Sequence, residues 1–187
     1  MKTKKLIFAA LFAALTCVAT MIIKVPTPTM GYIHPGDSIV LLSGFLLGPV
    51  YGGLAAGIGS MFSDLFGGYF SYAPATFVIK TLTAVFASLL FRAFTKKLSD
   101  VSAGKQAAFT AISGTIGEAF MVFGYFVFEI FLMAMATGDG FSSTSLAAGV
   151  ASSASGIPFN IVQGLFGVIL STILYPLLKK PLAQFTD

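Results

Sequence analysis

The chain has 187 residues, of which 56% are hydrophobic and only 10% are charged, and its mean hydropathy is +0.91. Soluble domains carry about 25% charged residues, so this composition excludes an ordinary soluble protein and also a disordered chain. It predicts an all-α integral membrane protein, because helices satisfy their own backbone hydrogen bonds in lipid. The single cysteine excludes an intrachain disulfide.

The chain opens with a basic start and an apolar stretch. Lys2, Lys4 and Lys5 precede the run 6–23, a pattern shared with signal peptides. Cleavage of a signal peptide should release a soluble domain, but the rest of this chain is as hydrophobic as its start. A retained first helix is therefore expected over about 5–23.

The next apolar region follows a Pro- and Gly-rich loop over 24–36 and is divided by Gly48-Pro49. Proline removes a helix hydrogen bond and disfavours helix at the residue before it, so two helices are expected, over about 38–48 and 50–66. Each is shorter than the ~20 residues that a span normally needs. They are interpreted either as short spans within a bundle or as a re-entrant pair.

Three further helices are expected in the second half of the chain, over about 75–94, 106–137 and 156–178, separated by polar loops over 95–105 and 138–153. One domain, 1–187, is thus predicted to form a six-transmembrane-helix bundle. An even number of spans places both termini on the same side of the membrane.

The basic residues support this topology. Nine of the eleven fall on the side that holds the termini: Lys2, Lys4, Lys5, Arg92, Lys96, Lys97, Lys105, Lys179 and Lys180. Cytoplasmic segments are enriched in Lys and Arg, so both termini are expected in the cytoplasm. The net charge of +4 is then a topology signal and does not indicate nucleic-acid binding.

Several ionisable groups fall at membrane depth, where each costs on the order of 3 kcal/mol unless it is paired or hydrated. Glu118, Tyr125 and Glu129 are separated by seven and four residues, which puts them on one stripe of a helix. Lipid would reject such a stripe. It is expected to face a cavity or another helix.

Polar groups on the neighbouring helices extend this pattern. Asn160 and Gln163 share one helix face and can both donate and accept hydrogen bonds, and Lys80 lies on the helix before the acidic stripe. Lys80 could simply pair with Glu118 or Glu129 between helices. A cavity for a small hydrogen-bonding solute is favoured, because there are more acids than one lysine can neutralise.

The loop over 26–35 is expected to form a lid on this cavity, and it carries His34 and Tyr32. A lone histidine in a loop is usually solvated, so no metal site is expected. The chain has no G-x-x-x-x-G-K-[ST] phosphate loop, no H-E-x-x-H sequence and no serine elbow. Neither enzyme activity nor a cofactor is therefore expected.

A pattern of small residues lies on the first helix. Ala9 and Ala13 are four residues apart, as are Ala10 and Ala14. Small residues at this spacing make a flat face that lets another helix approach closely. Packing inside the same bundle would also explain them.

The sequence resembles the substrate-binding S component of energy-coupling factor (ECF) vitamin transporters. The resemblance rests on the basic start with its Ala-x-x-x-Ala face, and on the Pro-rich loop leading into His-Pro-Gly-Asp over 34–37. The runs GFLLGPVYGGLAAGIGSMFSDLFGGY (44–69) and YAPATFVIKTLTA (72–84) complete it. It is most specific between Gly31 and Ala84.

The resemblance implies a six-helix subunit in the plasma membrane of a prokaryote that captures a vitamin from outside. It also implies a membrane-embedded coupling protein (the T component), for which Ala9, Ala10, Ala13 and Ala14 would be the docking face. Two separate ATP-binding subunits would hydrolyse ATP.

Within this family the pattern is most similar to members that handle pyridoxine or the hydroxymethylpyrimidine precursor of thiamine, with riboflavin next. The substrate would be held by Lys80, Glu118, Tyr125, Glu129, Asn160, Gln163, His34 and Tyr32. In that arrangement Tyr125 would stack on the vitamin ring.

Two other functions compete with this hypothesis. A stand-alone ion-coupled secondary transporter could use Glu118 and Glu129 as proton sites, although the sequence shows no inverted repeat. A membrane scaffold or assembly protein would bind no small molecule.

Overall fold

Nearly all of the described chain is helical. The structure is a computed structural model, and it describes residues 2–29, 31–96, 102–138 and 140–186. The helices are α1 (Lys2–Ile22), α2 (Asp37–Leu47), α3 (Pro49–Gly67), α4 (Ala73–Thr95), α5 (Ala103–Ala136) and α6 (Ser143–Thr186). Two short antiparallel strands, β1 (Val25–Pro26) and β2 (Tyr32–Ile33), form a hairpin between α1 and α2. The all-α prediction is confirmed.

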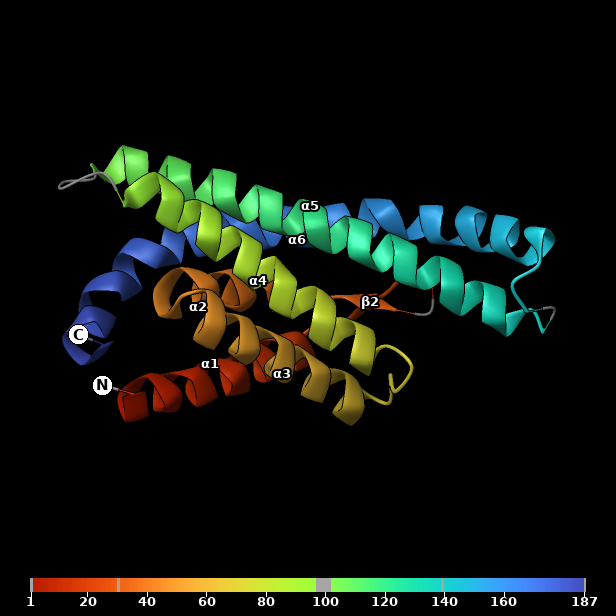
Figure 1. Cartoon of the computed structure of the whole chain (residues 1–187), viewed down its shortest axis with the longest axis horizontal. Helices are drawn as coiled ribbons and strands as arrows, with labels where there is room; N and C mark the ends of the chain where they lie inside the picture. The colour runs from red at the N-terminus through yellow and green to blue at the C-terminus, as the bar shows by residue number, and fades with distance from the viewer. Residues whose placement is uncertain (1, 30, 97–101, 139, 187) are drawn as a thin grey trace.

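The helices form an elongated bundle (Figure 1). The long helices α5 and α6 pack against each other, α1 packs on α3, and α4 lies between α3 and α5. The start of α1, the end of α4, the start of α5 and the end of α6 lie at one end of the bundle. The hairpin and the turns from α3 to α4 and from α5 to α6 lie toward the other end.

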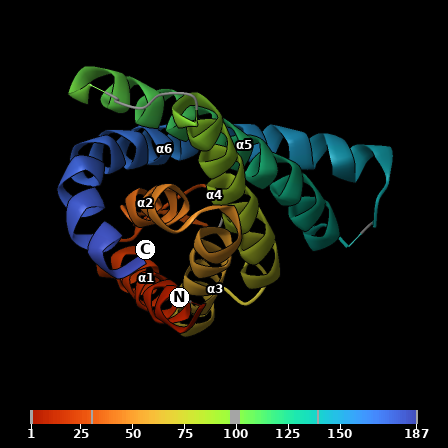
Figure 2. The ribbon, with the colours of Figure 1, turned by 60° about the vertical axis from the view of Figure 1, so that its left-hand side comes forward.

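The short helix α2 occupies the centre of the bundle. It contacts all five other helices, and Figure 2 shows it surrounded by α1, α3, α4 and α6. Nine of its eleven residues are buried. A helix that is apolar on every side is expected to be buried on every side. α2 is apolar apart from Asp37, Ser38 and Ser43, and these three polar residues are buried as well.

The break between α2 and α3 falls where the sequence places it. Gly48 has φ of +88°, a conformation that favours glycine, and Pro49 opens α3 at its first position. Gly48 ends α2 and Pro49 begins α3. The structure therefore has two helices, Asp37–Leu47 and Pro49–Gly67, where helices over 38–48 and 50–66 are predicted.

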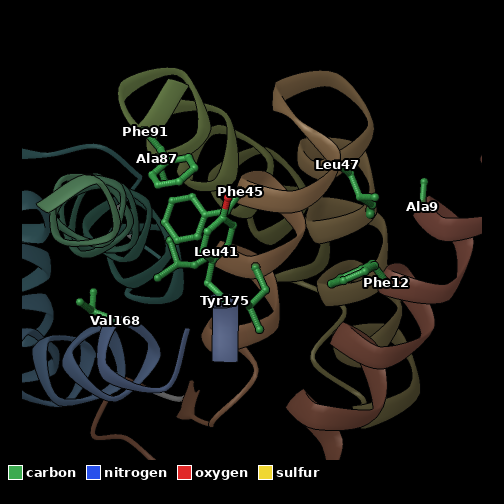
Figure 3. Close-up of a cluster of buried hydrophobic side chains, with 11 residues drawn as sticks. Ala9, Phe12, Leu41, Phe45, Leu47, Ala87, Phe91, Val168 and Tyr175 are labelled. Atoms are coloured by element: carbon green, nitrogen blue, oxygen red, sulfur yellow. The ribbon is translucent and has the colours of Figure 1, made fainter. Parts of the chain in front are cut away.

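The main apolar core lies at the end of the bundle that holds the chain termini. Phe45 of α2, Phe91 of α4 and Tyr175 of α6 meet there (Figure 3), with ring centroids 5.1 to 6.0 Å apart. On the other side of α2, Phe12 and Ala9 of α1 join the same cluster. The charged residue of α2, Asp37, lies at the opposite end of this helix.

The predicted loop over 138–153 is wrong for most of its length, because α6 begins at Ser143 and not near residue 156. The small residues that suggested a loop instead allow close packing of α6 on α5. A Cβ on Gly149 would lie 2.5 Å from the backbone oxygen of Ile130, and Ser145 and Ser153 are buried.

Four helices, α1, α4, α5 and α6, are long and apolar enough to cross a membrane, while α2 is shorter. Large apolar side chains point outward along them, as at Leu11, Phe86, Phe123 and Ile169. Exposed apolar surface on this scale is unfavourable in water but favourable in lipid. The chain is a multi-pass membrane protein.

Replacing Gly149 with alanine should weaken the packing of α5 on α6. The added methyl group collides with the Ile130 backbone, which cannot move as a side chain can, and overpacking of this kind costs about 1–3 kcal/mol. Thermal unfolding in detergent should show a lower melting temperature. The matched control is Gly104→Ala, where a Cβ meets no atom within 4 Å, and equal melting temperatures for the two variants would contradict the packing argument.

Candidate substrate-binding cavity

A polar cavity lies beneath the hairpin, between α1, α3, α4, α5 and α6. The space between atoms there is about 420 Å³, part of which is open to solvent, and about 30 Å³ admits the centre of a water molecule. Its walls are Thr20, Thr27, Gly31, Tyr32, His34, Ser60, Asp64, Tyr72, Thr76, Tyr125, Glu129, Asn160 and Gln163. Such a density of hydrogen-bonding groups inside a membrane bundle is suited to a small polar solute.

The hairpin is held over this cavity by two carboxyl groups. Thr29 donates its hydroxyl hydrogen to Glu129 Oε1 over 2.9 Å, and Tyr32 donates to Asp64 Oδ1 over 2.7 Å. Tyr72 adds a bond of 2.6 Å to the backbone oxygen of Thr29. The segment expected to form a lid therefore covers the cavity and is anchored to two separate helices.

Each of the two carboxyl groups keeps one oxygen without a partner. Asp64 Oδ2 and Glu129 Oε2 are buried and make no hydrogen bond to the described residues, and the same holds for the hydroxyls of Thr20 and Ser60. An unsatisfied buried polar group costs about 1–3 kcal/mol. These four atoms are ready to bind hydrogen-bonding groups of a ligand.

One edge of the cavity is connected to the centre of the bundle by a chain of hydrogen bonds. Gln163 accepts a bond of 2.9 Å from the backbone N–H of His34 and donates one of 2.6 Å to Asp37 Oδ2. Lys80 Nζ lies 2.5 Å from Asp37 Oδ1, and both side chains are fully buried. The position of Gln163 therefore depends on the ion pair at the start of α2.

The structure brings six of the eight candidate site residues to the cavity wall: Tyr32, His34, Tyr125, Glu129, Asn160 and Gln163. Lys80 and Glu118 are not among the wall residues. The alternative that Lys80 pairs with Glu118 or Glu129 is wrong, because its partner is Asp37. That pairing joins α4 to α2, and helix periodicity alone does not reveal contacts between separate helices.

Glu118 lies behind this ion pair. Its carboxyl group is buried beside Asp37, and a Cβ on Gly164 of α6 would lie 3.0 Å from the Cβ of Glu118. Although Glu118 shares a helix stripe with Tyr125 and Glu129, it is more than a turn deeper in the bundle. The cavity ends before it.

The wall also contains residues outside the eight candidates. Asp64 and Ser60 share one face of α3, and Thr76 shares a face of α4 with Lys80, so the sequence does show these three as polar groups on helices. Tyr72 was missed, although it lies four residues before Thr76 and this spacing could have identified it. Thr20 gives no such signal, because threonine is common in membrane helices. Within the described part of the chain, no group of three or more His, Cys, Asp or Glu side chains could hold a metal ion.

The imidazole of His34 is neutral in this setting. Burial lowers its pKa to about 3, helped by the positive charges of Lys80 and Lys24 and opposed by Asp37. Its Nδ1 accepts a hydrogen bond from the backbone N–H of Gly36 over 3.1 Å. Protonation would remove that acceptor.

The stability of the folded chain should therefore fall as the pH is lowered. An unfolded histidine titrates near 6.5, so between about pH 6.5 and 3 the unfolded state takes up the proton first and unfolding is favoured. Melting temperatures measured across this range should decline less steeply for His34→Gln than for the unchanged chain. Parallel curves would show that His34 does not contribute.

Breaking the central ion pair from one side should be strongly destabilising. Asp37→Asn or Lys80→Met leaves one buried charge without its partner, which costs about 3–5 kcal/mol. The double variant should recover part of this loss, since it buries neither charge. Unfolding curves for the three variants in detergent would test the coupling, and strictly additive losses would contradict it.

Comparison with known proteins agrees with this architecture. A solved structure described as the S component of a bacterial ECF transporter matches with a TM-score of 0.61 and 22% identity, over 100% of this chain and 99% of the other. An uncharacterized protein of Pyrococcus woesei is 31% identical over 163 residues, which is 87% of this chain and 98% of the relative. The family model described as "ECF-type riboflavin transporter, S component" matches residues 1–180. The chain therefore belongs to this family of ECF transporter S components.

Proposed function

We propose that this chain is the high-affinity vitamin-binding subunit of an ECF-type importer. It captures a small water-soluble B-type vitamin or precursor from outside and passes it to a coupling protein. The observation that carries the proposal is the polar cavity at the hairpin end, with four buried hydrogen-bonding atoms that the described residues leave unpaired. Tyr125, Asn160 and the other residues of the cavity wall would contact the vitamin.

The cavity has to enlarge before a vitamin can enter. Pockets that enclose drug-sized ligands have volumes of about 300–1,000 Å³, and the water-accessible part here is about 30 Å³. The hairpin is the part of the wall that can move, because it is joined to the bundle by side-chain bonds from Thr29, Tyr32 and Tyr72. We infer that it opens to admit the vitamin.

In this proposal all six helices cross the membrane and both termini are cytoplasmic. Among the described residues, Lys4 and Lys5 near the start of α1, Arg92 and Lys96 at the end of α4, Lys105 at the start of α5 and Lys179 in the last part of α6 belong to segments at the same end of the bundle (Figure 1). Lys97 and the side chains of Lys2 and Lys180 lie outside the described residues. The positive-inside rule then places the cavity at the outer face, where a vitamin arrives.

The proposed substrates are pyridoxine or hydroxymethylpyrimidine. Both are single rings with hydroxyl or amino donors, which suit a compact cavity whose unpaired atoms include oxygens of Asp64 and Glu129. The Tyr125 hydroxyl is held by Thr76 over 3.1 Å, which fixes its ring against a ligand. Riboflavin is the second candidate, and the name of the matching family favours it.

Partner docking is proposed for the groove between α1 and α3. Ala9, Ala10, Ala13 and Ala14 line it together with larger apolar side chains, and its volume is about 630 Å³. A helix of the coupling protein would fit there, because small residues allow close approach. Two ATP-binding subunits would supply the energy, and this chain would itself be no enzyme.

The geometry does not favour the ion-coupled alternative. A proton pathway through Glu118 and Glu129 would have both groups face one cavity, and only Glu129 lines it. The two hypotheses differ in what the isolated chain does. A vitamin-binding subunit binds without transporting, whereas a secondary transporter alone moves substrate when a proton gradient is applied.

The test is to purify the chain in detergent, release any bound compound with acid and identify it by mass spectrometry. A vitamin in near-stoichiometric yield is expected, together with no uptake into liposomes that contain the chain alone. Uptake driven by a proton gradient would instead support the secondary transporter. Absence of vitamin binding in both this assay and direct titration would refute the proposal.

Substitutions in the cavity should weaken vitamin binding. Glu129→Gln and Asn160→Ala should each raise the dissociation constant by roughly 10-fold or more, because loss of a hydrogen bond at a buried site costs about 1–3 kcal/mol. Titration calorimetry would measure this. The control is Thr115→Val on the outer side of α5, where the hydroxyl bonds only to its own helix, and unchanged affinity is expected.

A further inference from the structure

Glu118 is a buried acid that lies outside the cavity wall. Only 4% of this residue is exposed, and neither of its oxygens accepts a hydrogen bond from an N–H or O–H group in the described part of the chain. Helix α6 encloses it closely, since a Cβ on Gly164 would lie 3.4 Å from Glu118 Oε2. A buried polar group without a partner is unfavourable, so the presence of an acid here needs a physical explanation.

The Glu118 carboxyl lies within hydrogen-bonding reach of a second carboxyl, that of Asp37 at the start of α2. Two carboxyl groups can form a hydrogen bond only when one of them carries a proton and donates it. Asp37 is suited to be the acceptor, because Lys80 and Gln163 already donate to its two oxygens over 2.5 and 2.6 Å. The donor is then Glu118.

The charges around Glu118 lead to the same assignment. Helix α4 contributes one cation, Lys80, and it is the one cation in the described part of the chain whose charge acts on Glu118. Helix α2 contributes Asp37, and α6 faces Glu118 with the uncharged Gly164. His34 beside Asp37 is neutral, as described above. One buried cation balances one buried anion, and a second anion in contact with the first would be strongly unfavourable.

We propose that Glu118 is a positioning residue of the vitamin site, which keeps its proton inside the bundle and donates it in a hydrogen bond to Asp37. The effect reaches the cavity through Gln163, which donates to Asp37 and accepts from the backbone N–H of His34 next to the hairpin. Without Glu118, Asp37 is held by two donors instead of three, and Gln163 is less firmly placed. The positioning role rests on the proposed vitamin-binding function.

Two substitutions of similar size separate the donated hydrogen bond from the shape of the side chain. Glu118→Gln keeps a donor that can reach Asp37, whereas Glu118→Leu fills a similar volume without one. The purified full chain in detergent is titrated with pyridoxine, hydroxymethylpyrimidine or riboflavin, whichever it binds. The dissociation constant should rise by at most about 3-fold in the glutamine variant and by about 10-fold or more in the leucine variant.

Equal affinities for the two variants, whether lowered or not, would overturn the positioning role. The control is Thr115→Val, which changes α5 about one turn before Glu118 at a hydroxyl that bonds to its own helix. Its affinity should equal that of the unchanged chain. A loss as large as that of Glu118→Leu would show that binding responds to any change in this part of α5, and would also overturn the role.

Infrared spectroscopy tests the proton itself, and it requires neither a vitamin nor the leucine variant. A protonated carboxyl group has a C=O stretching band at a frequency where carboxylates and amides do not absorb. At neutral pH, the spectrum of the unchanged chain minus that of Glu118→Gln should contain this band. Any contribution from Asp64 or Glu129 cancels, because both proteins contain these residues. Absence of the band would mean that Glu118 is ionised, and would overturn the inference.

The two measurements distinguish a failure of this inference from a failure of the proposed function. If the unchanged chain binds none of the three vitamins, the proposed function fails and the positioning role fails with it, whatever the infrared spectrum shows. If a vitamin binds and the band is missing, the proposed function stands and the inference about Glu118 fails alone.

Discussion

The ion pair between Lys80 and Asp37 is the interaction on which the arrangement of the site depends. Both side chains are fully buried inside the bundle, where either charge would be strongly unfavourable without the other. Asp37 is also the first residue of α2, the helix that every other helix contacts. The pair thus fixes the polar end of the central helix against α4, and Gln163 extends this contact to α6 and to His34.

The apolar core and the polar cavity lie toward opposite ends of α2. Toward the end that holds the chain termini, Phe45 packs with Phe91 and Tyr175 in an apolar core (Figure 3). Toward the hairpin, the same helix ends in Asp37 and the hydrogen bonds around the cavity. With the apolar core at one end and the polar cavity at the other, the proposed opening of the hairpin would leave the packing of the core unchanged.

The sequence was sufficient to predict the class of fold, the break at Gly48-Pro49 and six of the thirteen residues of the cavity wall, because composition, proline and helical spacing are local signals. It was insufficient for contacts between helices. Helix spacing offers Glu118 or Glu129 as an alternative partner for Lys80, whereas its actual partner, Asp37, lies 43 residues earlier on a separate helix. The start of α6 was missed because Gly149 and its serine neighbours are typical of loops in water, whereas in lipid small residues favour close helix packing.

The lengths of α5 and α6 have a mechanical consequence. At 1.5 Å per residue, the 34 residues of α5 extend about 51 Å, well beyond the ~30 Å hydrocarbon layer of a bilayer. Apolar side chains continue almost to its end, with Phe131 and Met135 exposed, and a stretch of this length is kept in lipid by tilting, by kinking or by local thickening of the bilayer. Since α5 and α6 also supply Glu129 and Asn160, any such adjustment to the thickness of the lipid acts on one wall of the cavity.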